Sequence, residues 1–152
     1  MTSHCGHLIR VLTTCTDQAM TAALTSMDLT AAQGKIMGFI ARQSQPPCPR
    51  DLEEAFQLSH PTVSGLLNRL EKKGFIEFQP DEKDRRSKRI YLLPKGRKLI
   101  EQMYQTILST EALLVQDFSE EEHRQFQDLL TRAITNMGGH PCKRKHKEES
   151  DT

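Results

Sequence analysis

Apolar residues recur along most of the chain at the spacing of amphipathic helices. In residues 59–74 they stand at i, i+3, i+4 and i+7, as Val63, Leu66, Leu67 and Leu70. Comparable stripes predict helices over residues 4–27, 30–43, 50–57, 94–116 and 119–137. Apolar and polar residues instead alternate over residues 76–78 and 90–92, which predicts two short strands. The chain is therefore expected to be mainly α, with a small β component (α+β).

Residue types at the expected helix ends support these boundaries. Ser59 is expected to cap the helix over residues 59–74, and Gly74 to end it with a left-handed backbone. Pro94 suits the first turn of the following helix, where a missing N–H costs nothing. Capping boxes are expected at two other helix starts, Thr30–Gln33 and Ser119–Glu122.

The helices over residues 50–57 and 59–74 are joined by a tight turn and form a helix-turn-helix, which the hairpin follows. The segment between the two strands, PDEKDRRSKR, is too charged to be buried. A helix followed by a basic-tipped hairpin is typical of a winged helix, which places the helix in a DNA groove and the hairpin beside it. Residues 29–93 are thus predicted to form a winged helix-turn-helix DNA-binding region.

The flanking helices carry more apolar surface than a small winged helix can cover. Long amphipathic helices at both ends of a chain usually pair with each other or with a second copy. Residues 1–28 and 94–137 are therefore expected to form the helical dimerisation region of a homodimer. Residues 138–152 are a polar tail with little to bury and are expected to be disordered.

Charge is unevenly distributed along the 152 residues. The net charge is only +1, but residues 69–98 carry 11 basic and 5 acidic side chains, a net +6, against −5 elsewhere. A basic middle between more acidic ends suits a molecule with one face toward phosphate. The alternatives are a solvated charged hairpin and a winged helix used for protein–protein contact. Duplex binding that weakens steeply with salt distinguishes DNA binding from both.

Other function classes lack their sequence signatures. There is no Gly-rich phosphate loop, nucleophile elbow or HExxH motif, so neither an enzyme activity nor a cofactor is expected. No apolar run approaches the ~18 residues of a membrane span. No cationic start followed by an apolar core is present. The chain is expected in the cytoplasm, away from membranes, with its four cysteines reduced.

Two stretches, DLEEAFQLSHPTVSGLLNRLEKKGFIE and DEKDRRSKRIYLLPKG, resemble the MarR family (multiple-antibiotic-resistance regulators) of bacterial transcription factors. The resemblance extends over roughly residues 8–137. The family's wing typically reads Asp-x-Arg, a strand, and a Leu-Thr-x-x-Gly helix start. The corresponding residues here are Asp84-Arg85-Arg86, Ile90 to Leu92, and Leu93-Pro94-Lys95-Gly96. The chain departs from the family at Leu93, which replaces a capping Thr, and at Gly65, which replaces a longer polar residue.

The resemblance implies a dimeric repressor with a recognition helix in the major groove and a wing in the adjacent minor groove. The partner would be double-stranded DNA carrying a pseudo-palindromic operator. The resemblance also implies that a small ligand, often aromatic and anionic, or oxidation of a thiol releases the DNA.

The exposed face of the recognition helix is expected to hold the DNA contacts. Its candidate residues are His60, Pro61, Thr62, Ser64, Gly65, Asn68, Arg69 and Lys72. Asn68 and Arg69 are long enough to reach base edges, whereas Thr62 and Ser64 suit phosphates or short base contacts. His60 lies in the first turn, where backbone N–H groups attract phosphate. An ordinary solvated helix face is the alternative.

The wing offers a second set of DNA contacts. Arg86 is the candidate for insertion into the minor groove, with Arg85 and Lys88 on phosphates. Because DNA repels a carboxylate, Asp84 is expected to orient Arg86 or Arg85 through an ion pair.

A thiol- or zinc-responsive switch on the same fold is the alternative to a small ligand. Cys15 lies on the apolar stripe of the first helix. Its two candidate roles are a redox sensor and a small buried side chain of the core. A zinc site would draw on His and Cys near both chain ends, at His4, Cys5, His7, His140 and Cys142. Their spacing matches no closed metal motif, and ordinary terminal residues are the preferred interpretation.

Overall fold

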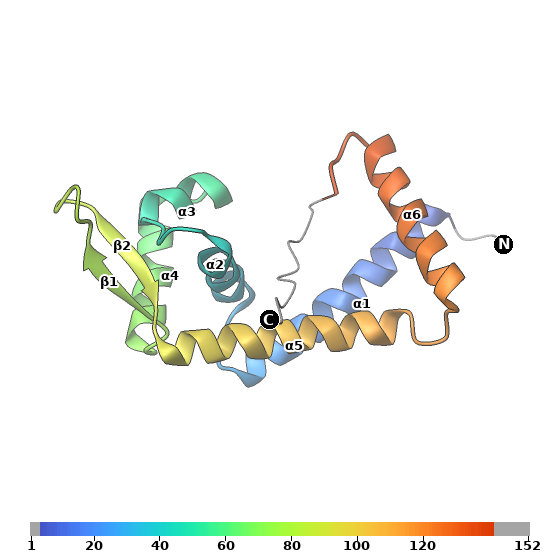
Figure 1. The fold of residues 1–152 in the computed structure, drawn as a ribbon, viewed down its shortest axis with the longest axis horizontal. Coiled ribbons are helices and arrows are strands. Elements are labelled where there is room, and N and C mark those ends of the chain that lie inside the picture. Colours follow the sequence, from blue (N-terminus) through green and yellow to red (C-terminus); the bar gives the residue numbers. More distant parts are fainter. Residues whose placement is uncertain (1–3, 142–152) are drawn as a thin grey trace, which may run out of the picture. The chain divides into compact units, whose positions relative to one another are not determined.

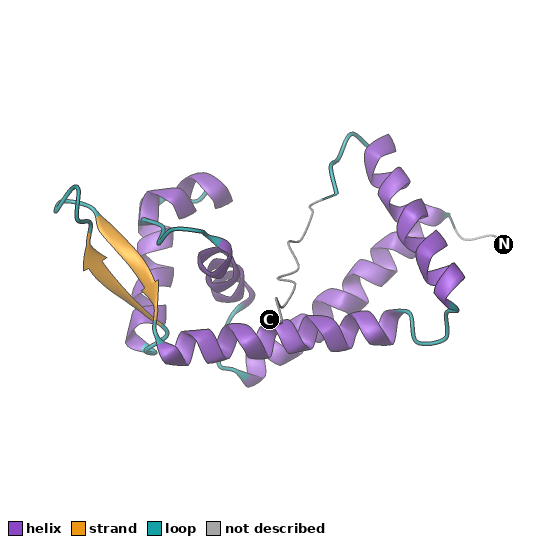
Figure 2. Ribbon diagram, viewed as in Figure 1, coloured by secondary structure: helices purple, strands orange, loops and turns teal. Residues whose placement is uncertain are grey.

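The structure is a computed structural model that describes residues 4–141, and Figures 1 and 2 show its elements. In chain order these are α1 (Cys5–Ser26), α2 (Ala31–Arg42), α3 (Pro49–Phe56), α4 (His60–Lys72), β1 (Ile76–Pro80), β2 (Lys88–Leu92), α5 (Pro94–Leu114) and α6 (Glu120–Asn136). Each helix and strand expected from the sequence is present near its expected bounds. The mainly helical winged-helix fold class is confirmed.

The chain divides into two compact units, residues 1–111 and 112–152. Within the first unit, Leu24 of α1 and Leu99 of α5 are buried in the same core as side chains of α2, α4 and the hairpin. The end of α1 and the start of α5 therefore fold as parts of that core.

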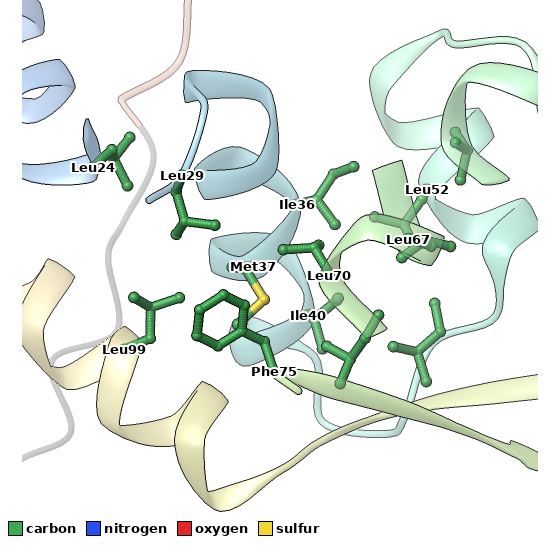
Figure 3. Packing of buried hydrophobic residues seen from close by; sticks show 13 residues of the cluster. Leu24, Leu29, Ile36, Met37, Ile40, Leu52, Leu67, Leu70, Phe75 and Leu99 are labelled. Carbon is green, nitrogen blue, oxygen red and sulfur yellow. The ribbon is translucent and has the colours of Figure 1, made fainter. Parts of the chain in front are cut away.

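The core of the first unit lies between α2, α4 and the hairpin (Figure 3). Val63, Leu67 and Leu70 are fully buried, as the stripe in the sequence predicts, and Leu66 packs against them half-buried. The other wholly buried apolar side chains come from α2, α3 and the two strands, as Ile36, Met37, Leu52, Ile76 and Ile90. Burying this stripe fixes the rotation of α4 about its own axis.

The hairpin is an antiparallel pair in which Ile76 lies opposite Leu92 and Phe78 opposite Ile90. Its second strand is also tied to the loop before α3, because the Ile90 N–H donates to the carbonyl of Pro47 at 2.8 Å. The hairpin is thus anchored to the helix-turn-helix through both its apolar face and its backbone.

Both capping boxes expected from the sequence are present, at Thr30–Gln33 and Ser119–Glu122. Gly74 has the expected left-handed backbone, with φ of 76°. Ser59 is the N-cap residue of α4, as expected, but its side chain makes no capping bond to a backbone N–H. The second helical residue, Pro61, has no N–H to offer, and the Ser59 hydroxyl instead bonds the Thr62 hydroxyl at 2.8 Å.

Gly96 in the first turn of α5 lies directly against the backbone of the residue that precedes the hairpin. A Cβ at this position would be 2.1 Å from the carbonyl oxygen of Phe75, which already accepts a bond from the Leu93 N–H at 3.0 Å. Since the backbone cannot move aside as a side chain does, only glycine fits at this position in the first turn of α5.

Replacing Gly96 with alanine should therefore destabilise the fold strongly. We expect Gly96→Ala to lower the free energy of unfolding by about 3 kcal/mol or more, at the upper end of the cost of overpacking. Gly6→Ala is the control, because a Cβ there meets nothing within 4 Å. Urea denaturation at fixed protein concentration measures both, and equal midpoints for the two variants would contradict the assignment.

Candidate nucleic-acid interface

One face of α4 is free because Val63, Leu67 and Leu70 hold the other face in the core. Ser64 is half-buried, and the other candidate residues are exposed, as His60, Pro61, Thr62, Gly65, Asn68, Arg69 and Lys72. The structure therefore places the whole predicted set on one accessible helix surface.

A groove of about 440 Å³ runs between α4 and the hairpin. It brings His60, Ser64 and Asn68 of the helix together with Lys88 of β2. Its remaining lining residues are Pro49, Leu67, Glu71, Phe78, Gln79 and Pro80. Arg85 and Arg86 do not line it, because they lie in the turn that joins β1 to β2. Helix and wing thus present two separate sets of polar and basic groups, one along the groove and one beyond the strand ends.

The first turn of α4 is held by a contact across the helix-turn-helix. Nδ1 of His60 lies 2.6 Å from Oε1 of Glu53 in α3, and its Nε2 lies 3.4 Å from the Ser64 hydroxyl. The sequence analysis did not identify Glu53. The contact joins two helices through the turn, so helical spacing gives no signal for it.

Two carboxylates build the turn of the wing. Asp84 accepts from the backbone N–H of Arg86 at 3.0 Å, and Asp81 accepts from that of Lys83 at 2.9 Å. Asp84 makes no ion pair with Arg85 or Arg86 within the residues that the structure describes, so the expected ion pair is not formed. The N–H of Arg86 bonds this carboxylate in place of a guanidinium, and both arginine side chains are exposed to solvent.

The ion pair of the wing is instead formed by Asp81 and Arg89, neither of which the sequence analysis assigned a role. Arg89 Nε donates to Asp81 Oδ2 at 2.7 Å, and its Nη1 donates to the carbonyl of Pro46 at 3.2 Å. The N–H of Lys83, with the bond from Arg89, lowers the pKa of Asp81, and the same bond raises the pKa of Arg89. Arg89 therefore ties the wing to the loop before α3.

The lowered pKa of Asp81 gives a pH dependence with a definite sign. A carboxyl group with a lower pKa in the folded state stabilises it above the unfolded pKa, near 3.8, and loses this effect as pH falls through the folded pKa. We expect the NMR signals of the Lys83 amide and Arg89 Nε–H to hold their positions from pH 7 to about 4 and to shift below it. Asp81→Asn, which cannot titrate, should abolish the shift. A transition near pH 6 in the wild type would contradict the assignment.

The candidate thiol and metal residues are not brought together. Cys15 is exposed on α1, so the interpretation as a small buried side chain is wrong for the single chain. Cys142 lies outside the described residues. Within residues 4–141 no three His, Cys, Asp or Glu side chains are grouped so that they could hold a metal ion. In the same part of the chain, no helix has the length and apolarity needed to cross a membrane.

Comparison with known proteins identifies the family. A family model described as "MarR family" matches residues 27–87. The HTH-type transcriptional regulator PecS of Dickeya dadantii is 30% identical over 123 residues, covering 80% of this chain and 74% of PecS. The chain belongs to the MarR family. It is accordingly a transcription regulator and not an enzyme.

Solved structures of MarR-family proteins agree with this assignment. MepR, "a transcription regulator of the Staphylococcus aureus multidrug efflux pump MepA", is 32% identical, with a TM-score of 0.81 over 89% of this chain and 99% of MepR. A MepR–DNA complex has the same identity and coverage and a TM-score of 0.68. MarR of E. coli, at 24% identity and a TM-score of 0.71, shares the fold.

Proposed function

We propose that this MarR-family regulator is a dimeric repressor that binds duplex operator DNA through α4 and the hairpin. The observation that carries the proposal is an accessible α4 face beside a wing turn whose Arg85 and Arg86 side chains are exposed and make no ion pair among the described residues. The relative MepR has been solved as a DNA complex, which supports the same use of this fold. Such a regulator acts where the DNA is, in the cytoplasm.

In the proposed complex, α4 enters the major groove and the hairpin turn reaches the adjacent minor groove. Asn68 and Arg69 contact base edges, while Arg86 enters the minor groove, with Arg85 and Lys88 on phosphates. Asp84 accepts from a backbone N–H, and Asp81 accepts from a backbone N–H and from Arg89. This supports the arrangement, because it fixes the turn and leaves the guanidinium groups of Arg85 and Arg86 unpaired.

The wing assignment can be tested by two substitutions with different expected effects. Arg86→Ala should weaken binding to a selected duplex about tenfold or more, since it removes a minor-groove contact. Lys88→Ala should mainly reduce the slope of log affinity against log salt, by about 1. Arg132→Ala, an exposed arginine of α6, is the charge-matched control and should change neither quantity.

Gel-shift titrations at several salt concentrations provide both measurements. Equal, small effects of Arg86→Ala and Lys88→Ala would contradict the assignment. If wild-type affinity for duplex DNA does not fall with salt, the winged helix is instead a surface for protein contact.

The proposed dimer interface is formed by helices whose apolar side chains have no cover in the single chain. Leu24 is the only buried residue of α1, and α6 has none. The exposed apolar residues of these helices and α5 include Leu8, Ile9, Val11, Tyr104, Leu108, Leu113, Leu129 and Ile134. Pairing residues 1–28 and 94–137 of two copies covers them. It also sets two recognition helices about 34 Å apart for a pseudo-palindromic site.

Light scattering should give twice the chain mass of 17.4 kDa for the wild type. Leu129 is 58% exposed in the single chain, so Leu129→Glu should shift the mass toward one chain by placing a charge in the interface. Gln127→Glu adds the same charge at an exposed polar position of α6 and should remain dimeric. A monomeric wild type, or dissociation of both variants alike, would rule out this interface.

The proposal includes release of DNA by a small aromatic or anionic ligand. Zinc responsiveness gains no support from the described residues, where no metal cluster forms, and Cys15 is an exposed free thiol on α1. Operator affinity measured with an aromatic acid, with peroxide and with zinc separates the three switches, and the acid alone is expected to lower it.

A further inference from the structure

Gly65 lies in the middle of α4, where glycine is unfavourable. A glycine inside a helix is less stable than alanine at the same position. Nothing in this chain requires glycine here, because Gly65 is not among the glycines with positive φ, which are Gly74 and Gly138. A Cβ built on Gly65 meets nothing within 4 Å, whereas one on Gly96 strikes the backbone. The advantage of glycine at this position must therefore come from outside the chain.

The position of Gly65 indicates what that outside partner is. Gly65 lies on the exposed line formed by Pro61, Asn68 and Lys72, at helical spacings of three and four residues. This line faces away from the core and is the centre of the proposed DNA-binding surface. Between the side chains of Pro61 and Asn68, the helix backbone itself forms the surface. A partner can therefore come closer to the helix axis here than at positions that carry a side chain.

The chemistry of this gap is apolar. Gly65 presents only its Cα hydrogens, because backbone N–H and C=O groups in a helix interior bond each other. Most groups that base pairs expose in the major groove are donors or acceptors, which would lose water here without gaining a partner. The exception is the C5-methyl group of thymine. We propose that a thymine methyl group occupies the gap at Gly65, which makes Gly65 a specificity-determining residue.

This inference rests on the proposed DNA binding and can be tested separately from it. Duplexes that bind the wild type are selected from a random pool, and each thymine of the selected site is replaced in turn by deoxyuridine, which lacks only the methyl group. One replacement per half-site should weaken wild-type binding about fourfold, the value of one buried methyl group. Gly65→Ala should weaken binding to the selected duplex about tenfold, the size of one mismatched base pair.

The decisive measurement combines the two changes. With Gly65→Ala, the duplex carrying deoxyuridine at that same position should recover most of the lost affinity, since the Cβ then takes the place of the methyl group. Deoxyuridine at other positions should not restore binding. Gly38→Ala is the matched control in the interior of α2, where a Cβ meets only the Arg42 guanidinium, and it should bind as the wild type does.

The thermal midpoint of Gly65→Ala should equal or exceed that of the wild type, which excludes loss of fold as the cause of weaker binding. Wild-type affinity in Gly65→Ala, or a loss that no deoxyuridine position restores, overturns the inference and leaves the proposed function standing. If the wild type enriches no duplex from the pool, both the proposed DNA binding and the role of Gly65 are contradicted.

Discussion

The burial of Val63, Leu67 and Leu70 is the constraint from which the other features of this structure follow. These side chains pack α4 against α2 and the hairpin, and a helix with one face fixed has no freedom in what it presents on the other. Protein interiors are close-packed, so a rotation of α4 about its axis would open cavities in the core. The chemistry of the exposed face is therefore encoded by the apolar residues as much as by the polar ones.

The wing is held by different forces. Its turn has little apolar surface to bury, and its shape comes from carboxylates that accept backbone N–H groups and from Arg89, which reaches the loop before α3. Each of these interactions is partly exposed and individually weak. The wing is thus less rigid by construction than the helix beside it. In the proposed complex, this difference suits a segment that enters a groove of variable width.

The sequence predicted what depends on local spacing and missed what depends on tertiary contact. The apolar stripe, two capping boxes and the turn at Gly74 follow from residues a few positions apart. Ser59 stands at the N-cap but makes no side-chain cap, because Pro61 has no N–H and the Ser59 hydroxyl bonds the hydroxyl of Thr62 instead of its N–H. Arg89 pairs with Asp81 across the hairpin turn and with Pro46, which is far away in sequence, so neither helical nor strand spacing predicts these contacts.

The close packing of Gly96 on Phe75 also has a mechanical consequence. Only Leu93 separates β2 from α5, so the helix leaves the hairpin without a flexible linker. The 21 residues of α5 make a rod about 30 Å long. Pivoted at its rigid first turn, such a rod converts a tilt of about 5° into about 3 Å of travel at its far end. A small tilt at the first turn of α5 thereby becomes a larger displacement at its C-terminal end.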